Sequence, residues 1–85
     1  MSEHEIEITI IVNGQPIAEH VNVKMQLREV VKRALDRSGN SGQPIENWEL
    51  RDAVGQVLDL SKTVEQYGIV NGAKLFLNLK AGVGG

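Results

Sequence analysis

The side chains that could do chemistry in this sequence are few and scattered. A metal site needs convergent ligands, yet neither His4 nor His20 has a His or Cys partner at ligand spacing. The four serines lie near loops or termini, and neither His has a positioning neighbour, so a hydrolytic triad is not indicated. The glycine-rich segments 39–42 and 82–85 do not lie between a strand and a helix N-terminus, as a phosphate cradle requires. We therefore expect no enzymatic activity and no metal or other cofactor. The carboxyl end of the chain remains as the candidate functional group.

The composition favours one small globular domain. Hydrophobic residues make up 41% of the 85 residues and charged residues 24%, enough for a single core with a polar surface. The net charge of −2 argues against nucleic-acid or anionic-membrane binding, where Lys and Arg neutralise phosphates. The absence of Cys excludes disulfides and thiolate chemistry. Neither a secretory signal nor an apolar run near the ~20 residues of a membrane span is present, so we expect a cytoplasmic protein.

The amino-terminal third of the sequence predicts a β-hairpin. Residues 5–12 alternate apolar and polar side chains, the period of a half-buried strand, and Asn13-Gly14 is a strong hairpin signal because both residues tolerate positive φ. The return strand spans about residues 17–23. Pro16 cannot donate to a ladder, so this strand is expected to lie at a sheet edge or to begin at Pro16. Glu19 breaks the apolar alternation, which suggests an edge or a bulge.

A helix and further strands follow. Residues 26–38 carry one apolar stripe at helical spacing, and Gly39 reads as the left-handed residue that ends the helix. A third strand starts at Trp48 and runs to about Ala53, a short fourth strand covers residues 57–58, and a single helical turn covers residues 61–68. The last strand, residues 74–79, has alternating leucines. This order predicts an α+β fold in which one helix covers a mixed five-strand sheet.

These elements predict a core of aliphatic side chains and one tyrosine. Within it, the helix turns its apolar stripe, which includes Ala34, toward the sheet. The predicted core residues are Ile6, Ile8, Ile10, Val21, Val23, Leu27, Val30, Val31, Leu35, Leu50, Leu58, Tyr67, Leu75, Leu77 and Leu79.

The carboxyl-terminal part of the chain resembles ubiquitin. Residues 62–69 are similar to the segment that leads into ubiquitin's last strand, residues 74–80 are similar to that strand, and both sequences end in Gly-Gly. The hairpin, the helix and the loop that follows it fit as well, so the resemblance covers roughly residues 5–85. It implies a ubiquitin-like β-grasp domain over residues 1–79 and a flexible diglycine tail over residues 80–85.

The resemblance also implies a protein modifier and favours a bacterial relative, a group that includes members of antiphage pathways. In that family an activating enzyme uses ATP to adenylate the terminal carboxylate, a conjugating enzyme transfers the acyl group to target proteins, and in bacteria a zinc peptidase removes it. Gly84 and Gly85 would form the activated terminus, because a backbone without Cβ atoms can thread a narrow enzyme channel. The modifier itself supplies no catalytic group.

Strand alignment with ubiquitin places a partner-binding patch on this chain. The aligned positions are Arg51, Phe76 and Asn78, which make the patch more polar than that of ubiquitin. Ile11 joins them, because a β-grasp sheet places its strand beside those of Arg51 and Phe76. Two alternatives stay open. A sulfur carrier would share the fold and the adenylation but end in a thiocarboxylate, although the segment around Tyr67 favours the modifier. A ubiquitin-like interaction domain that is never conjugated would not need its tail.

Overall fold

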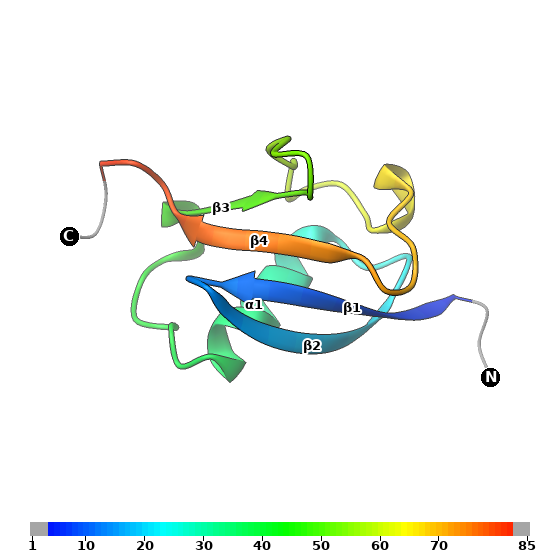
Figure 1. The fold of residues 1–85 in the computed structure, drawn as a ribbon, viewed down its shortest axis with the longest axis horizontal. Coiled ribbons are helices and arrows are strands. Elements are labelled where there is room, and N and C mark those ends of the chain that lie inside the picture. Colours follow the sequence, from blue (N-terminus) through cyan, green and yellow to red (C-terminus); the bar gives the residue numbers. More distant parts are fainter. Residues whose placement is uncertain (1–3, 83–85) are drawn as a thin grey trace.

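Four strands, one α-helix and two short 3₁₀ turns make up the fold in the computed structural model, which describes residues 4–82. The helix lies across one face of the mixed sheet, whose strand order is β2-β1-β4-β3 (Figure 1). In chain order the elements are β1 (Glu5–Val12), β2 (Gln15–Asn22), α1 (Leu27–Arg37), the 3₁₀ turn Ile45–Asn47, β3 (Trp48–Arg51), the 3₁₀ turn Glu65–Tyr67 and β4 (Lys74–Leu79). The fold is a ubiquitin-like β-grasp, as the sequence predicts.

The β1–β2 hairpin closes at the predicted turn. Asn13 and Gly14 both have positive φ, at 49° and 87°, which matches the twist of a two-residue hairpin loop. β2 forms one edge of the sheet, as Pro16 indicates. The suggestion of a bulge at Glu19 is wrong, because antiparallel pairing continues without interruption along the whole hairpin. Glu19 instead points inward, is 2% exposed, and accepts a hydrogen bond of 3.2 Å from Arg37 in the last turn of α1.

The helix ends as its sequence predicts. Gly39 adopts a φ of 76°, and its N–H donates to the Asp36 carbonyl at 3.2 Å. The Asn40 N–H donates to the Leu35 carbonyl at 2.8 Å, which completes a Schellman motif. The start of the helix lacks a side-chain cap at Gln26.

Two strand predictions in the second half of the chain need correction. β3 ends at Arg51, earlier than the predicted Ala53, because the Asp52 N–H bonds to the Gln56 carbonyl at 3.0 Å and closes a turn. The fifth strand at residues 57–58 is reduced to an isolated bridge between Val57 and Arg51. Beyond that bridge, the Asp59 N–H donates to the Tyr67 hydroxyl at 2.7 Å and so does not extend the ladder.

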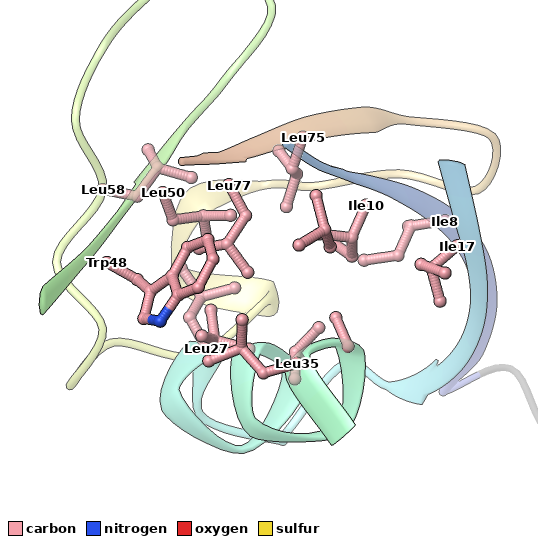
Figure 2. Close-up of a cluster of buried hydrophobic side chains, with 14 of the residues drawn as sticks. Ile8, Ile10, Ile17, Leu27, Leu35, Trp48, Leu50, Leu58, Leu75 and Leu77 are labelled. Atoms are coloured by element: carbon pink, nitrogen blue, oxygen red, sulfur yellow. The ribbon is translucent and has the colours of Figure 1, made fainter. Parts of the chain in front are cut away.

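The core lies between the inner face of the sheet and α1 (Figure 2). All five apolar residues of the helix stripe are buried, and the alternating leucines Leu75 and Leu77 of β4 meet them from the sheet. Four predicted core residues are only partly buried at its margin: Ile6, Val23, Tyr67 and Leu79. Four others join the core without having been in the predicted set: Val12, Ile17, Trp48 and Val64. Trp48 extends the core along β3.

Candidate functional site: the outer face of the sheet

The strand register brings three of the four predicted patch residues into one row. Ile11 of β1 pairs with Phe76 of β4, and Arg51 of β3 pairs with the same Phe76. Residues in register on neighbouring strands turn their side chains to the same face. Because Leu75 and Leu77, on either side of Phe76, point into the core, this row lies on the face of the sheet opposite α1.

The row is apolar at its centre and polar at its β3 end. Ile11 and Phe76 are half-buried and adjacent, while Arg51 and Asn78 are exposed. Pro16 of β2 pairs with Ile11 and extends the apolar part to the sheet edge. The surface therefore offers a small apolar strip with hydrogen-bonding groups at one end.

Arg51 is fixed in place by neighbours of its own. Its Nε and Nη2 atoms donate to Glu49 Oε1 at 3.2 and 2.8 Å, and its Nη1 atom donates to the Gly55 carbonyl at 2.8 Å. The ion pair with Glu49 offsets the charge of the guanidinium, and the three bonds restrict its rotation. Arg51 can therefore offer a partner a positioned planar group more readily than a free charge.

Glu49 also belongs to this surface, in addition to the four predicted residues. It pairs in register with Asn78 and is half-buried on the outer face. Glu49 lies two residues before Arg51 on the same strand, and this spacing predicts that the two side chains share a face. Lys74 and Thr9, another registered pair, continue the outer face on the other side of Phe76.

The predicted activation terminus, Gly84 and Gly85, lies outside the described residues. The chain leads toward it from β4, which ends at Leu79 on the side of the molecule opposite the start of β1 (Figure 1). The Lys80 N–H donates to the Asn47 carbonyl at 2.8 Å, so the backbone is held for one residue past the strand. Nearby, a hydrogen bond from Arg28 holds the pKa of Glu46 below its usual value of 4.5, with a smaller contribution from the charge of Lys80.

The described part of the chain shows neither a cluster of metal ligands nor a membrane-spanning helix. Among residues 4–82, no three His, Cys, Asp or Glu side chains gather where they could hold a metal ion. His20 lies on the outer face, 81% exposed, with its Nε2 atom 3.9 Å from a carboxylate oxygen of Glu7. No helix within residues 4–82 has the length and apolarity needed to cross a membrane.

Comparison with solved structures places the fold in the ubiquitin-like class. A de novo designed protein based on ubiquitin matches with a TM-score of 0.80 and 22% identity, over 99% of each chain. Ubiquitin from Caldiarchaeum subterraneum matches with a TM-score of 0.77 and 23% identity, over 95% of this chain and 99% of that one. The N-terminal ubiquitin-like domain of the 4931431F19Rik protein matches with a TM-score of 0.76 and 14% identity, over 99% of this chain and 83% of that one. At these identities the likeness concerns the fold.

Within that class, the chain belongs to the family described as "Protein of Unknown function (DUF2604)", whose model matches residues 1–85. A relative from Sinorhizobium fredii (strain NBRC 101917 / NGR234), "Uncharacterized protein y4jI", is 44% identical over 81 residues. The match covers 95% of this chain and 62% of that relative. The chain thus spans less than two thirds of the relative's length.

Proposed function

We propose that this chain is a ubiquitin-like protein modifier that is activated at Gly85. The Gly85 carboxylate attacks ATP on an activating enzyme, giving an acyl-adenylate and pyrophosphate. An enzyme cysteine then displaces AMP to form a thioester, and an amine of a target protein displaces the thiol to form an amide bond. The protein supplies the acyl group and a recognition surface, and the enzymes supply the catalytic groups.

The observation that carries this proposal is a Gly-Gly sequence placed shortly after the last strand of a ubiquitin-like fold. The last backbone bond seen near this end ties Lys80 to Asn47, five residues before Gly85. In an extended chain each residue spans roughly 3.3–3.6 Å, so the carboxylate could reach well beyond the sheet into an enzyme cleft. The row of Ile11, Phe76 and Arg51, with Asn78 beside it, is the surface we assign to the activating and conjugating enzymes.

The setting we propose is the cytoplasm of a bacterium. The relative from Sinorhizobium fredii supports a bacterial source. The further partners we propose are target proteins and a zinc peptidase that removes the modifier, and the pathway we propose is antiphage defence. The net charge of −2 and the small outer patch favour protein partners over nucleic acid or membranes.

The proposed modifier function is tested on the protein purified from its host. Intact mass spectrometry first determines whether its mature chain ends at Gly85. Amino-terminally tagged protein is then incubated with host lysate and ATP, beside a variant that lacks Gly84 and Gly85. We expect ATP-dependent adducts with the full chain alone, and peptides in which Gly85 is joined to a target amine. Adducts formed by the truncated variant, or a mature chain that ends elsewhere, would contradict the proposal.

The same experiment separates the two alternatives. A sulfur carrier would show replacement of one Gly85 carboxylate oxygen by sulfur, visible as a mass increase that depends on ATP and a sulfur donor, and no linkage to targets. An interaction domain that is never conjugated would show neither product, and the truncated variant would function fully in the host. The segment around Tyr67 favours the modifier, since it resembles the corresponding part of ubiquitin.

A further inference from the structure

An apolar groove opens where the sheet lacks a strand, directly beyond the Arg51 and Phe76 pair of the proposed enzyme-binding row. β3 ends at Arg51, opposite Phe76, so the first two residues of β4, Lys74 and Leu75, have no neighbour on that side. The space beside them is a groove of about 340 Å³ between the loops of residues 52–57 and 68–73.

The groove walls carry hydrophobic side chains that the fold does not use. Val54 is 88% exposed and Val70 is 66% exposed, and the two come from different loops. The floor is formed by Leu58 and Leu75, which are 5% and 2% exposed. Single exposed valines are common on protein surfaces. Two that flank one apolar groove form a surface suited to a partner's side chain.

The backbone at the groove is arranged to accept a strand. The Thr9 N–H donates to the Ala73 carbonyl and the Asn13 N–H to the Leu77 carbonyl, so odd-numbered residues of β4 turn their peptide groups toward β1. Even-numbered residues turn theirs toward β3, as Lys80 does in donating to Asn47. Lys74 is even-numbered and lies beyond the end of β3. Its N–H and C=O therefore face the groove without a partner strand.

The groove is lined by one positive and one negative side chain, and of these two the positive one has no ion-pair or hydrogen-bond partner among the described residues. Asp52 and Lys74 both line it, but the Asp52 carboxylate accepts hydrogen bonds from the Val54 and Gln56 N–H groups of its own loop, at 3.1 and 2.9 Å. None of the five ion pairs found among residues 4–82 includes Lys74. A ligand that places a carboxylate near the Lys74 ammonium would complement this charge.

The opposite edge of the sheet is closed to a similar ligand. Arg37 Nη1 donates to the Ala18 carbonyl at 2.8 Å, and Arg33 Nη1 donates to the His20 carbonyl at 3.3 Å. Both carbonyls belong to the edge strand β2. The helix arginines thus occupy acceptors that an added strand would need.

We propose that the groove beside Lys74 binds an extended segment of another protein in which an acidic residue is flanked by aliphatic residues. In an added antiparallel strand, the residue opposite Lys74 turns its side chain to the outer face, where its carboxylate meets the Lys74 ammonium. The residues on either side of it turn inward, toward Val54, Val70 and the groove floor. This inference does not depend on the proposed activation of Gly85.

A second copy of the chain fits the groove poorly. The acidic residues of the chain that stand between two aliphatic neighbours occur in Ile6-Glu7-Ile8 and Leu58-Asp59-Leu60. Ile8 is 1% exposed and Leu58 is 5% exposed, so neither segment can leave the fold without opening the core. The occupant is therefore a different protein.

A titration with synthetic peptides tests the proposal. The probe is the acetylated and amidated peptide Thr-Val-Glu-Val-Thr, with Thr-Val-Lys-Val-Thr as its charge-reversed control. Amide signals of the isotope-labelled full chain are followed by NMR up to millimolar peptide. We expect saturable shifts at Val54, Val70, Lys74 and Leu75 with the Glu peptide, and weaker ones with the Lys peptide.

Three variants sharpen the result, and unchanged spectra elsewhere show that each is folded. Val54→Ser should weaken binding about tenfold, through the lost apolar contact. Lys74→Ala should weaken it roughly two- to fivefold, through the lost ion pair. Val57→Ser is the matched control, because Val57 is 48% exposed on the same loop but does not line this groove, and it should bind as the unmodified chain does.

Three results of the peptide titration would overturn the proposal: no saturable shifts with the Glu peptide, shifts centred on Ile11 and Phe76 instead of the groove, or equal binding by Val54→Ser and Val57→Ser. Groove signals that change with protein concentration in the absence of peptide would show that a second copy is the occupant and would also overturn it.

Discussion

The two faces of the central strands have opposite compositions, although they share one backbone. On the inner face of β4, Leu75 and Leu77 are at most 2% exposed and pack against α1. On the outer face, Phe76 is half-buried and Asn78 is exposed. Alternation along a strand lets one sequence encode both surfaces at once. We infer that the inner side chains contribute most of the free energy of unfolding, and that outer residues can be substituted without unfolding the domain.

The largest expected effect comes from neighbouring substitutions on opposite faces. Leu77→Ala removes a fully buried side chain and should lower the free energy of unfolding by about 2–5 kcal/mol, through lost transfer energy and a cavity. Asn78→Ala, the next residue on the outer face, should change it by less than about 0.5 kcal/mol. Chemical denaturation of both variants measures the difference. Equal losses in the free energy of unfolding for the two variants would contradict the different roles of the two faces.

A second prediction concerns the polar group on the inner face. Glu19 is 2% exposed and pairs with Arg37 at 3.2 Å, so Arg37→Ala leaves a buried carboxylate without this partner. We expect a loss of about 1–3 kcal/mol in the free energy of unfolding. Arg33→Ala is the matched control, since the side chain of Arg33 bonds to an exposed backbone carbonyl and to no buried carboxylate within residues 4–82, and it should cost less. The same denaturation assay compares them, and a larger loss for Arg33→Ala would contradict the importance of the Glu19 pair.

The third prediction concerns recognition on the outer face. Phe76→Ala should weaken binding to the proposed activating enzyme roughly tenfold, because Phe76 is the largest apolar group of the row. Its free energy of unfolding should stay within about 1 kcal/mol of the unmodified value. Lys32→Ala, on the exposed side of α1, is the control and should bind normally. Calorimetric titration measures both affinities, and equal affinity for the two variants would remove the row from the proposed interface.

The smallest effect concerns an exposed carboxyl away from both faces. The Ser61 hydroxyl, followed by the Ser61 N–H, holds the pKa of Asp59 below its ordinary 3.8. Ser61→Ala should therefore raise that pKa toward 3.8, as an NMR titration of the carboxyl would show. Because the pKa of Asp59 is lower in the folded than in the unfolded chain, its ionised carboxylate stabilises the fold above the unfolded pKa. This contribution is lost as the pH falls through the folded pKa. A stability difference between the two proteins that grows in acid would contradict this account.

Local periodicity was enough to predict the individual elements. The bounds of β4 match the prediction, and α1 lies within one residue of it at each end, because both have a strong apolar period and clear end signals. Contacts between residues far apart in the sequence could not be predicted from local periodicity. Glu19 breaks the apolar alternation of its strand, and the partner that lets it be buried, Arg37, lies 18 residues away in the sequence. The predicted strand at residues 57–58 is only a bridge, because Tyr67 binds the backbone of Asp59.

The candidate site shows the same limit. Alternation assigned Phe76 to the outer face, but its position beside Ile11 depends on a parallel register that the sequence does not encode locally. That placement came from the resemblance to ubiquitin. The bonds from Arg51 to Glu49 and Gly55 were not predicted, since they depend on where the turn after β3 closes. The groove beside Lys74 was missed for the same reason, because it exists only where β3 ends early.

The most direct test of recognition on the outer face of the sheet is an NMR titration of the labelled full chain with the proposed activating enzyme, once the adduct experiment has identified it. We expect amide signals to change along Ile11, Arg51, Phe76 and Asn78 and over residues 80–85, while those of the exposed side of α1 stay in place. Changes centred on Arg28 and Lys32 of α1, with the outer face of the sheet unaffected, would contradict the account.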